Sequence, residues 1–512
     1  MYSILGLGIV LIVWALLNLT DNMMQVEAKK QGVDTKNNNF SLFPSIASLL
    51  GGAKPSRVGG DPYYKLSRGH NIKLEGEADT NNAVDGSAVR YAVRPPEYRG
   101  IAPIPKLMVA EGDEVKAGDP VFFDKSNPDI KYSAPVSGEV VEVRRGAKRA
   151  ITEVIILADK EQAYRKYDVP GLDSDKESLV SFLCDSGFWP LINKRPFDVI
   201  ADPAVSPKNI FISTFDSAPL AADSNLIVSG NEELFAAGLK VLNQLTDGKV
   251  HLGINGRKGA KVSDAFAKAE GVDRHWFDGP HPSGNVGVQI HHIDPILTND
   301  VVWTLKVQDV ITLGELFTSG KFAPKRVVAV TGVNINKPHY IRTAAGANIG
   351  ELLKGNLDDS AKARIIDGNV LTGRTVTGDD FLNSGSSQIT VVNEGDYYEI
   401  FGWLLPIKPR PTISRSFPNF LFPKHKFIPD TNTHGEKRAF VVTGQYESVL
   451  PMDVYPQHIM KAIMTNDFER MDGLGLAELS EEDVALCEFT CTSKMPLQNI
   501  LRQGLDMLRE QS

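Results

Sequence analysis

Cysteine is scarce in this sequence. Only three occur in 512 residues, namely Cys184, Cys487 and Cys491. A disulfide-stapled fold needs a much denser set of cysteines, and a cluster that requires four thiolates cannot be built from this chain alone. The sequence therefore excludes a disulfide framework and predicts that the chain holds no iron–sulfur centre.

An excess of positive charge is also missing. Lysine and arginine total 55 against 63 aspartate and glutamate residues, which leaves a net charge of -8. Binding to a nucleic-acid backbone depends on clustered cationic side chains, so the balance excludes nucleic acid as the expected partner. The sequence also lacks a Ser/His/Asp order, a nucleophile elbow and a paired set of catalytic carboxylates. Without these groups, the sequence gives no sign of a self-sufficient catalyst.

The composition is that of an ordinary globular protein. Hydrophobic residues make up 42% of the chain and charged residues 23%. That proportion supplies material for large cores and excludes a disordered, collagen-like or polytopic membrane protein. At about 150 residues per domain, the length predicts three to four domains.

One uncharged hydrophobic run occurs at residues 3–19, with the sequence SILGLGIVLIVWALLNL. As a helix it would reach roughly 25 Å, slightly less than a hydrocarbon core. It has no positive residues before it and no cleavage site of small residues after it, which favours an uncleaved membrane anchor over a signal peptide or a buried helix. Lys29, Lys30 and Lys36 follow it, so the positive-inside bias places the bulk of the chain in the cytoplasm. Residues 21–63 are polar and predict a flexible linker.

Residues 64–160 predict a β domain of short strands. Gly112, Gly118 and Gly138 punctuate β-branched runs, each beside a turn-forming residue. The pattern resembles the biotinyl/lipoyl barrel-sandwich fold, in which a lysine at a hairpin tip carries a prosthetic group. Lys125 lies near that position, but its hairpin is longer than the lipoyl pattern, so we interpret it as a solvated loop lysine and keep modification as an alternative.

Residues 161–325 alternate between apolar strands and helical stretches, which predicts a Rossmann-like α/β domain. Strands are expected at residues 209–214 and 249–254, with a helix at 231–245. A glycine-bearing loop containing Gly253, Gly256 and Gly259 follows the second strand. Its location suits a phosphate-binding loop, but its spacing fits neither a dinucleotide fingerprint nor a Walker loop. We therefore interpret it as a vestigial phosphate loop.

Histidines and cysteines are the candidate metal ligands. His281, His291, His292 and Asp294 lie close in the sequence, and imidazoles with a carboxylate bind zinc or iron. Their spacing matches no helical or ribbon arrangement of ligands. We interpret them as loop or interface histidines, interpret Cys487 and Cys491 as buried structural thiols, and predict no metal site.

Several separated blocks resemble, in order, the NqrA family of the sodium-translocating NADH:quinone reductase. Together they extend over nearly everything after residue 65, and they comprise LSRGHNIKLEGEA (66–78), the segment 109–149, CDSGFWPLINKRPF (184–197), FDGPHPSGNVGVQIHHIDPI (277–296), DGNVLTG (367–373), FGWLLP (401–406), SRSFPN (414–419) and GQYESVLPMDVYP (444–456). This resemblance implies one component of a membrane complex, on the cytoplasmic side of the bacterial inner membrane, that oxidises NADH, reduces quinone and exports sodium.

The same resemblance implies the cofactors, partners and remaining domains. In such a complex NADH, the flavins FAD, FMN and riboflavin, the iron–sulfur centres and quinone are used together with subunits B to F, and the NqrA chain holds none of the flavins or clusters. The implied fold is similar to the flavin-binding subunit of respiratory complex I. It continues with a β-grasp domain of the SLBB type at residues 326–410 and a mainly helical C-terminal domain at residues 411–512, while the anchor is atypical for the family.

Quinone association is the role that the resemblance implies for this chain. A quinone site needs an apolar slot for a flat ring and polar donors for two carbonyl oxygens. The candidates are Trp276, Phe277 and Trp403 as ring walls and His281 as a donor. The alternative hypothesis is an autonomous flavin- or nucleotide-dependent oxidoreductase that uses the loop at residues 253–259.

Overall fold

The computed structural model describes residues 54–511 except 87, 102–104, 298–299, 359, 361, 400, 403–408 and 415–416, and also residues 13, 16, 17, 20, 23 and 24. The chain divides into two compact units, Met1–Gly59 and Gly60–Ser512. The predicted anchor at 3–19 and linker at 21–63 lie mostly outside the described residues. The six described residues among the first 24 are helical. Among all described residues, no helix combines the length and hydropathy needed to cross a bilayer.

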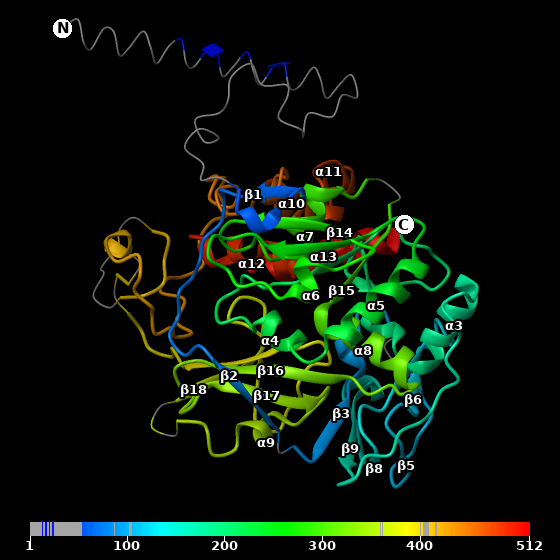
Figure 1. The fold of residues 1–512 in the computed structure, drawn as a ribbon. Coiled ribbons are helices and arrows are strands. Elements are labelled where there is room, and N and C mark those ends of the chain that lie inside the picture. The colour runs from blue at the N-terminus through cyan, green and yellow to red at the C-terminus, as the bar shows by residue number, and fades with distance from the viewer. Residues whose placement is uncertain are drawn as a thin grey trace, which may run out of the picture. The chain divides into compact units, whose positions relative to one another are not determined.

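The centre of the second unit is a seven-stranded sheet (Figure 1). Its order is β1 (Tyr63–Lys65), β14 (Asp273–Asp278), β13 (Val250–Asn255), β12 (Ile210–Ser213), β15 (Val302–Lys306), β10 (Asn193–Arg195) and β11 (Val199–Ile200). The first five strands are parallel, and β10 and β11 are antiparallel additions at one edge. Residues such as Ile210, Ile212, Leu252 and Ile254 are fully buried, which explains why these strands form apolar runs instead of alternating patterns.

Helices cover both faces of this sheet. They are α3 (Lys176–Ser186), α4 (Ser224–Val228), α5 (Glu232–Leu245), α6 (Asp264–Ala267), α7 (Val286–Ile293) and α8 (Val307–Ser319). The helices α5 and α8 approach each other closely, and Gly314 allows this approach. A Cβ on Gly314 would lie only 1.8 Å from the Leu234 carbonyl oxygen. The predicted helix at 231–245 and both predicted strands are present, so the α/β prediction is confirmed.

Two small sheets form the barrel-sandwich domain. One has the order β3 (Arg90–Val93), β9 (Ile151–Ala158), β8 (Gly138–Arg145) and β5 (Glu114–Val115), and the other has β4 (Lys106–Leu107), β6 (Pro120–Phe123) and β7 (Lys131–Ser133). Val121, Phe122, Val140 and Val154 are fully buried in it. Gly138 is required where β8 meets β9, because a Cβ there would lie 1.9 Å from the Leu157 carbonyl oxygen.

A six-stranded sheet forms the β-grasp domain. Its order is β19 (Arg374–Val376), β18 (Ala363–Asp367), β20 (Gln388–Asn393), β16 (Lys325–Thr331), β17 (His339–Ala344) and β2 (Asp79–Asp85), with α9 (Ile349–Leu353) beside it. Both β1 and β2 come from the stretch that the sequence assigns to the barrel. They instead pair with β14 and β17 in the other two sheets, where they cover exposed sheet edges.

The C-terminal region is helical only from Pro456 onward. It contains α10 (Pro456–Met464), α11 (Phe468–Gly473), α12 (Glu481–Thr490) and α13 (Leu497–Gln511), while residues 411–455 contain only the short 3₁₀ turn η5 (Pro418–Leu421) among their described residues. The prediction of a mainly helical region from 411 was therefore too wide. The remaining 3₁₀ turns of the second unit are η2 (Pro95–Glu97), η3 (Ala147–Arg149), η4 (Trp189–Leu191) and η6 (Leu476–Glu478).

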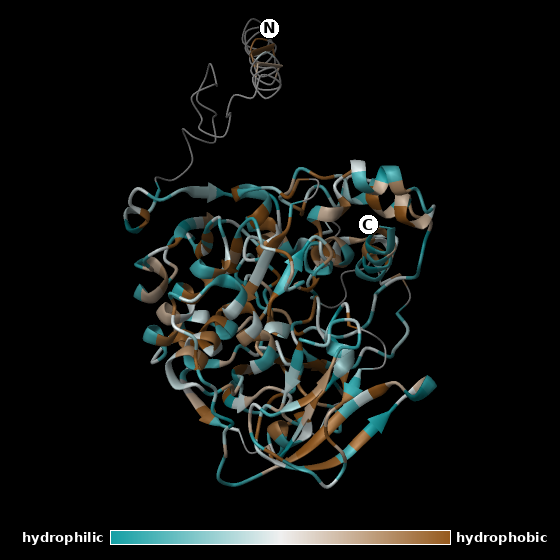
Figure 2. Ribbon diagram, turned by 90° about the vertical axis from the view of Figure 1, so that its right-hand side faces the viewer, coloured by the Kyte–Doolittle hydropathy of each residue, from teal (hydrophilic) through white to brown (hydrophobic). Residues whose placement is uncertain are grey.

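These helices share their core with the seven-stranded sheet. Met460, Leu486 and Leu501 belong to one buried apolar cluster with Phe277 of β14 and Val288 of α7. Figure 1 shows the orange and red C-terminal helices beside α7 and β14, and Figure 2 shows hydrophobic residues gathered in the sheets and helices while many surface loops are hydrophilic. The C-terminal helices are therefore packed onto the α/β domain and do not have a separate core.

Candidate functional site

A cavity lies at the carboxyl edge of the seven-stranded sheet. It has a volume of about 370 Å³ and is bordered by the loops that follow β12 and β13 and by α6. Ligands of open α/β sheets bind outside the carboxyl ends of strands, so this is the expected place for a site. Its polar lining comes from Asp216, Asp223, Asn225, Asn255 and Lys261, among others.

The polar groups of the cavity are tied to their own loops. The Asp216 carboxylate accepts a hydrogen bond from the Ala218 amide at 2.7 Å. Asp223 caps α4 by accepting from the Asn225 amide at 2.9 Å, and the Asn225 side chain in turn accepts from the Ser263 amide. The lining contains two carboxylates and a single lysine, so its charge repels a negatively charged phosphate group. The cavity therefore suits a neutral or cationic ligand better than a dinucleotide.

Each of the three glycines of the predicted phosphate loop has a different structural role. A Cβ on Gly253 would lie 1.8 Å from the Gln289 side-chain oxygen, so this glycine allows α7 to pack on β13. Gly256 donates its amide to the Phe277 carbonyl oxygen at 2.8 Å. Gly259 has a φ of +80° and open space around it, which is the geometry of a turn. None of the three is among the residues that line the cavity, and α6 after them is only four residues long.

Trp276 and Phe277, two of the predicted quinone walls, are fully buried in β14. The Trp276 indole donates to the Asp61 carboxylate at 3.1 Å, and the Phe277 ring stacks on Tyr64 with a centroid distance of 4.8 Å. Successive strand residues point to opposite faces, so the two rings do not form one slot. Trp403, the third predicted wall, lies outside the described residues.

His281, the predicted donor, is 3% exposed and lies in the loop after β14. Its Nδ1 is 3.0 Å from the Ser217 hydroxyl, which also accepts from the Gly284 amide. Its Nε2 is a buried atom with no partner among the described residues. Burial lowers the pKa of His281 to about 4, with Arg257 lowering it further and Asp216 opposing, so the ring is neutral at pH 7.

Arg257 joins the predicted loop to the loop after β14. Its Nε donates to the Gly279 carbonyl oxygen at 2.7 Å and its Nη2 donates to Ser283 at 3.1 Å. Burial lowers the pKa of this guanidinium. Sequence patterns did not single out Arg257, Ser217, Asp216 or Asp223. The position of Asp216 shortly after the buried strand β12 is the signal that could have found it.

The remaining candidate ligands face separate partners. His291 Nδ1 lies 2.7 Å from Glu478, and His292 Nε2 donates to the Pro451 carbonyl oxygen at 2.7 Å, so both contact the C-terminal region. Asp294 forms an ion pair with Lys208 at 2.8 Å. The structure does not bring these groups together with His281. Cys487 and Cys491 are buried, and the Tyr446 hydroxyl lies 2.9 Å from the Cys491 sulfur.

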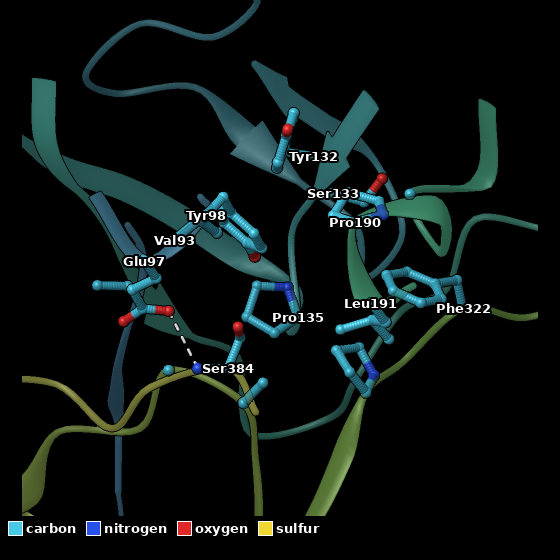
Figure 3. A pocket seen from close by; sticks show the side chains of 15 residues that line it. Val93, Glu97, Tyr98, Tyr132, Ser133, Pro135, Pro190, Leu191, Phe322 and Ser384 are labelled. Carbon is cyan, nitrogen blue, oxygen red and sulfur yellow. Dashed lines mark hydrogen bonds between the residues drawn. The ribbon is translucent and has the colours of Figure 1, made fainter. Parts of the chain in front are cut away.

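A second, much smaller cavity lies where the barrel, the α/β domain and the β-grasp domain meet (Figure 3). Its open volume of about 30 Å³ suits water and is too small for a quinone. The Ser384 amide donates to Glu97 across it at 3.0 Å, while burial raises the pKa of Glu97 to about 7 against the effect of Arg94. This cavity belongs to a domain junction.

Comparison with family models matches three consecutive parts of the chain. The NqrA N-terminal barrel-sandwich hybrid domain matches residues 64–159, the NqrA second alpha/beta domain matches 174–322, and the NQRA C-terminal domain matches 327–378. The solved NAD+-reducing [NiFe]-hydrogenase in the air-oxidized state aligns over 68% of this chain and 67% of its own, with a TM-score of 0.33 and 10% identity. That similarity is too low to carry an argument.

Curated relatives match nearly the whole of the second unit. The A subunit of the Na(+)-translocating NADH-quinone reductase from Vibrio alginolyticus is 37% identical over 432 residues, which is 83% of this chain and 95% of the relative. Its counterpart from Rhodopirellula baltica is 35% identical over 454 residues, 87% of this chain and 98% of the relative. The chain therefore belongs to the family of Na(+)-translocating NADH-quinone reductase A subunits.

Proposed function

We propose that this chain is the A subunit of a complex that couples NADH oxidation and quinone reduction to sodium export. The observation that carries the proposal is the match to relatives of that name over 83% to 87% of the chain. The complex as a whole is a sodium-transporting NADH:ubiquinone reductase, and this chain contributes structure and quinone association without catalysing the reaction alone. Its partners are subunits B to F, the membrane and quinone.

The carboxyl edge of the sheet supports a scaffold role. Its glycines serve packing and turns, and two carboxylates line its cavity. The three cysteines are too few for a four-thiolate cluster. In this proposal the flavins FAD, FMN and riboflavin, the iron–sulfur centres and the NADH site belong to the partner chains. The α/β domain keeps an architecture similar to that of the complex I flavin protein without its cofactor.

His281 is the group best suited to a quinone contact. In the tautomer that we propose, the Ser217 hydroxyl donates to Nδ1 and the ring proton lies on Nε2, which is buried and has no described acceptor. An unpaired buried donor gains from a carbonyl oxygen, and Phe277 lies in the same strand–loop segment. A photoreactive quinone should label the segment 277–284 in the assembled complex, and labelling should fall in a His281→Gln variant. Labelling elsewhere with equal yield in both proteins would contradict the contact.

An exposed apolar patch supports docking to the partner chains. Phe420, Leu421 and Phe422 are 72%, 61% and 62% exposed, in and just after η5. Exposed contiguous patches of this kind mark interaction sites on soluble surfaces. The patch adjoins Lys424 and Lys426, which gives it a cationic border.

Copurification tests the proposed assembly. A tagged full chain, purified from membranes in mild detergent, should bring down the membrane-embedded components of the complex. A triple variant with Phe420→Ser, Leu421→Ser and Phe422→Ser should recover them poorly. The matched control is Leu297→Ser, which removes a 67% exposed leucine in the loop after α7. Failure of the unmodified chain to recover any membrane component would contradict the proposed function.

Membrane attachment through residues 3–19 is part of the proposal. An anchor would hold the chain at the cytoplasmic face of the inner membrane and would raise the local concentration of its docking surface. Mass spectrometry of purified membranes should detect the intact N-terminal peptide. Detection of only a peptide that begins after residue 19 would contradict the anchor.

A further inference from the structure

Two histidines and an aspartate meet on adjacent strands, outside the cavity described above. His251 belongs to β13, and Asp273 and His275 belong to β14. In the parallel register His251 is opposite Asp273, and Gly253 is opposite His275. Because alternate residues of a strand share a face, the three side chains lie on one face of the sheet.

The three side chains have the spacing of a metal site. His251 Nδ1 and His275 Nε2 are 3.0 Å apart. One ligand atom from each of the three residues lies within 4.8 Å of the others. A zinc ion with bonds of about 2.0–2.1 Å brings neighbouring ligand atoms to roughly 3–3.4 Å. The two nitrogens already meet that requirement, and a carboxylate oxygen of Asp273 lies within 4.8 Å of both.

Contact between the two rings leaves the site incompletely satisfied. His251 and His275 are 6% and 7% exposed. The nitrogens in that contact, His251 Nδ1 and His275 Nε2, are the ones that an ion would bind. The outer nitrogens, His251 Nε2 and His275 Nδ1, are buried without a partner in the part of the chain that the structure describes, so no second hydrogen bond described there holds either ring.

The surroundings hold the ligands in place and leave an approach for an ion. The His251 ring stacks on Phe211 with a centroid distance of 4.7 Å and an interplanar angle of 21°. Asp273 is 42% exposed, so the outer side of the cluster is open to solvent. Lys249 bonds to Asp273 Oδ2 at 2.7 Å. The other carboxylate oxygen remains available for an ion.

We propose that His251, Asp273 and His275 bind a divalent transition metal of the zinc class. Two imidazoles and a carboxylate suit zinc, whereas calcium and magnesium prefer all-oxygen sites. Three protein ligands leave one position for water. The ion joins β13 directly to β14. The site is independent of the quinone contact at His281.

Cobalt(II) is the probe for this site, because its visible absorption reports coordination. The full chain, stripped of metal with a chelator, should develop visible absorption bands on titration with Co²⁺, and these should saturate at one ion per chain. Added Zn²⁺ should remove the bands by displacement. Absence of cobalt bands would overturn the proposal.

Variants locate the ion. His251→Gln and His275→Gln should each weaken Co²⁺ binding by about tenfold or more, and Asp273→Asn, at a partly exposed position that preserves the fold, should weaken it as well. His458→Gln is the matched control, because His458 is an exposed histidine of α10 outside the cluster. Circular dichroism checks that each variant is folded. The proposal would be overturned if folded Asp273→Asn and the two histidine variants gave unchanged cobalt spectra. It would also be overturned if the cobalt bands were lost in the His458→Gln control alone.

Discussion

The carboxyl edge of the seven-stranded sheet and the seam between that sheet and the C-terminal helices use charge in opposite ways. At the edge, Asp216 and Asp223 bond to the backbone of their own loops beside an open cavity. At the seam, Arg195 is 2% exposed and its Nη1 lies 3.4 Å from Asp483, which is fully buried. At the seam, fully buried charges therefore hold the C-terminal helices to the sheet. At the edge, where related folds hold a cofactor, the carboxylates bond to the backbone of their own loops.

Several charged contacts meet around Arg195 at the seam. Arg195 also contacts Glu482 at 3.2 Å and Asp198 at 3.5 Å. Burial raises the pKa of Asp483 while Arg195 opposes that effect, so the carboxylate depends on the guanidinium for its charge. The C-terminal helices are consequently locked to the sheet by both an ionic network and a shared apolar core.

Replacing Arg195 should produce the largest loss of stability. Arg195→Met leaves Asp483 buried without its cation, which should lower the free energy of unfolding by about 3–5 kcal/mol. Urea denaturation followed by circular dichroism measures it. Arg470→Met is the matched control, because Arg470 pairs with Asp467 at 3.3 Å but is 75% exposed, and it should cost about 1 kcal/mol or less. Equal losses in the two variants would remove the contrast between seam and surface.

Gly253 tests whether the loop glycines serve packing. Gly253→Ala places a Cβ against Gln289 of α7, and overpacking of this kind should lower the free energy of unfolding by about 1–3 kcal/mol. Gly171→Ala is the control, because the nearest atom to its Cβ would be 4.0 Å away, and it should change stability by about 0.5 kcal/mol at most. A stable Gly253→Ala protein that had lost nucleotide or flavin binding would instead indicate a working phosphate loop.

His281 should make stability depend on pH. Its folded-state pKa of about 4 lies below the unfolded value of 6.5, so between these values the unfolded chain binds the additional proton. Stability from this group is therefore present above pH 6.5 and is lost as the pH falls toward 4, by about 1.4 kcal/mol per pH unit at most.

The measurement is urea unfolding at several pH values for the native chain and His281→Gln. The native chain should lose more stability than the variant between pH 6.5 and pH 4.5. Identical pH profiles would show that His281 titrates normally and would weaken its assignment as a neutral donor.

Lys125 should give the smallest effect. It is an exposed residue beside Asp124, whose carboxylate accepts from the Ser126 amide and hydroxyl. Lys125→Ala should change the free energy of unfolding by about 0.5 kcal/mol at most, and the native chain should have the mass of its unmodified sequence. Added mass that disappears in the variant would support the carrier alternative.

Local patterns were sufficient to predict much of the fold. Turn residues at Gly112, Gly118 and Gly138 predicted short strands, whose pattern resembles the biotinyl/lipoyl barrel-sandwich fold, and the apolar runs at 209–214 and 249–254 predicted two strands of the parallel sheet. The pairing of β1 and β2 with the other two sheets was not predicted, because their partners lie more than 200 residues away along the chain. No local pattern encodes which distant edge a short strand covers.

The candidate site was harder to predict from the sequence, because its residues also come from distant parts of the chain. Proximity along the chain drew attention to His281, His291, His292 and Asp294, yet they face different partners. His251 and His275 are 24 residues apart and meet only through the parallel register of β13 and β14. The two predicted aromatic walls in β14 point to opposite faces, which a count of aromatic residues cannot reveal.

One measurement tests the central claim that this chain assists a sodium-translocating reductase instead of running the chemistry alone. The purified full chain is supplied with NADH and quinone, its visible absorption is recorded, and its NADH oxidation is compared with that of the assembled complex. We expect a colourless chain without NADH oxidation and an active complex. A yellow chain that passes electrons from NADH to quinone by itself would contradict the claim.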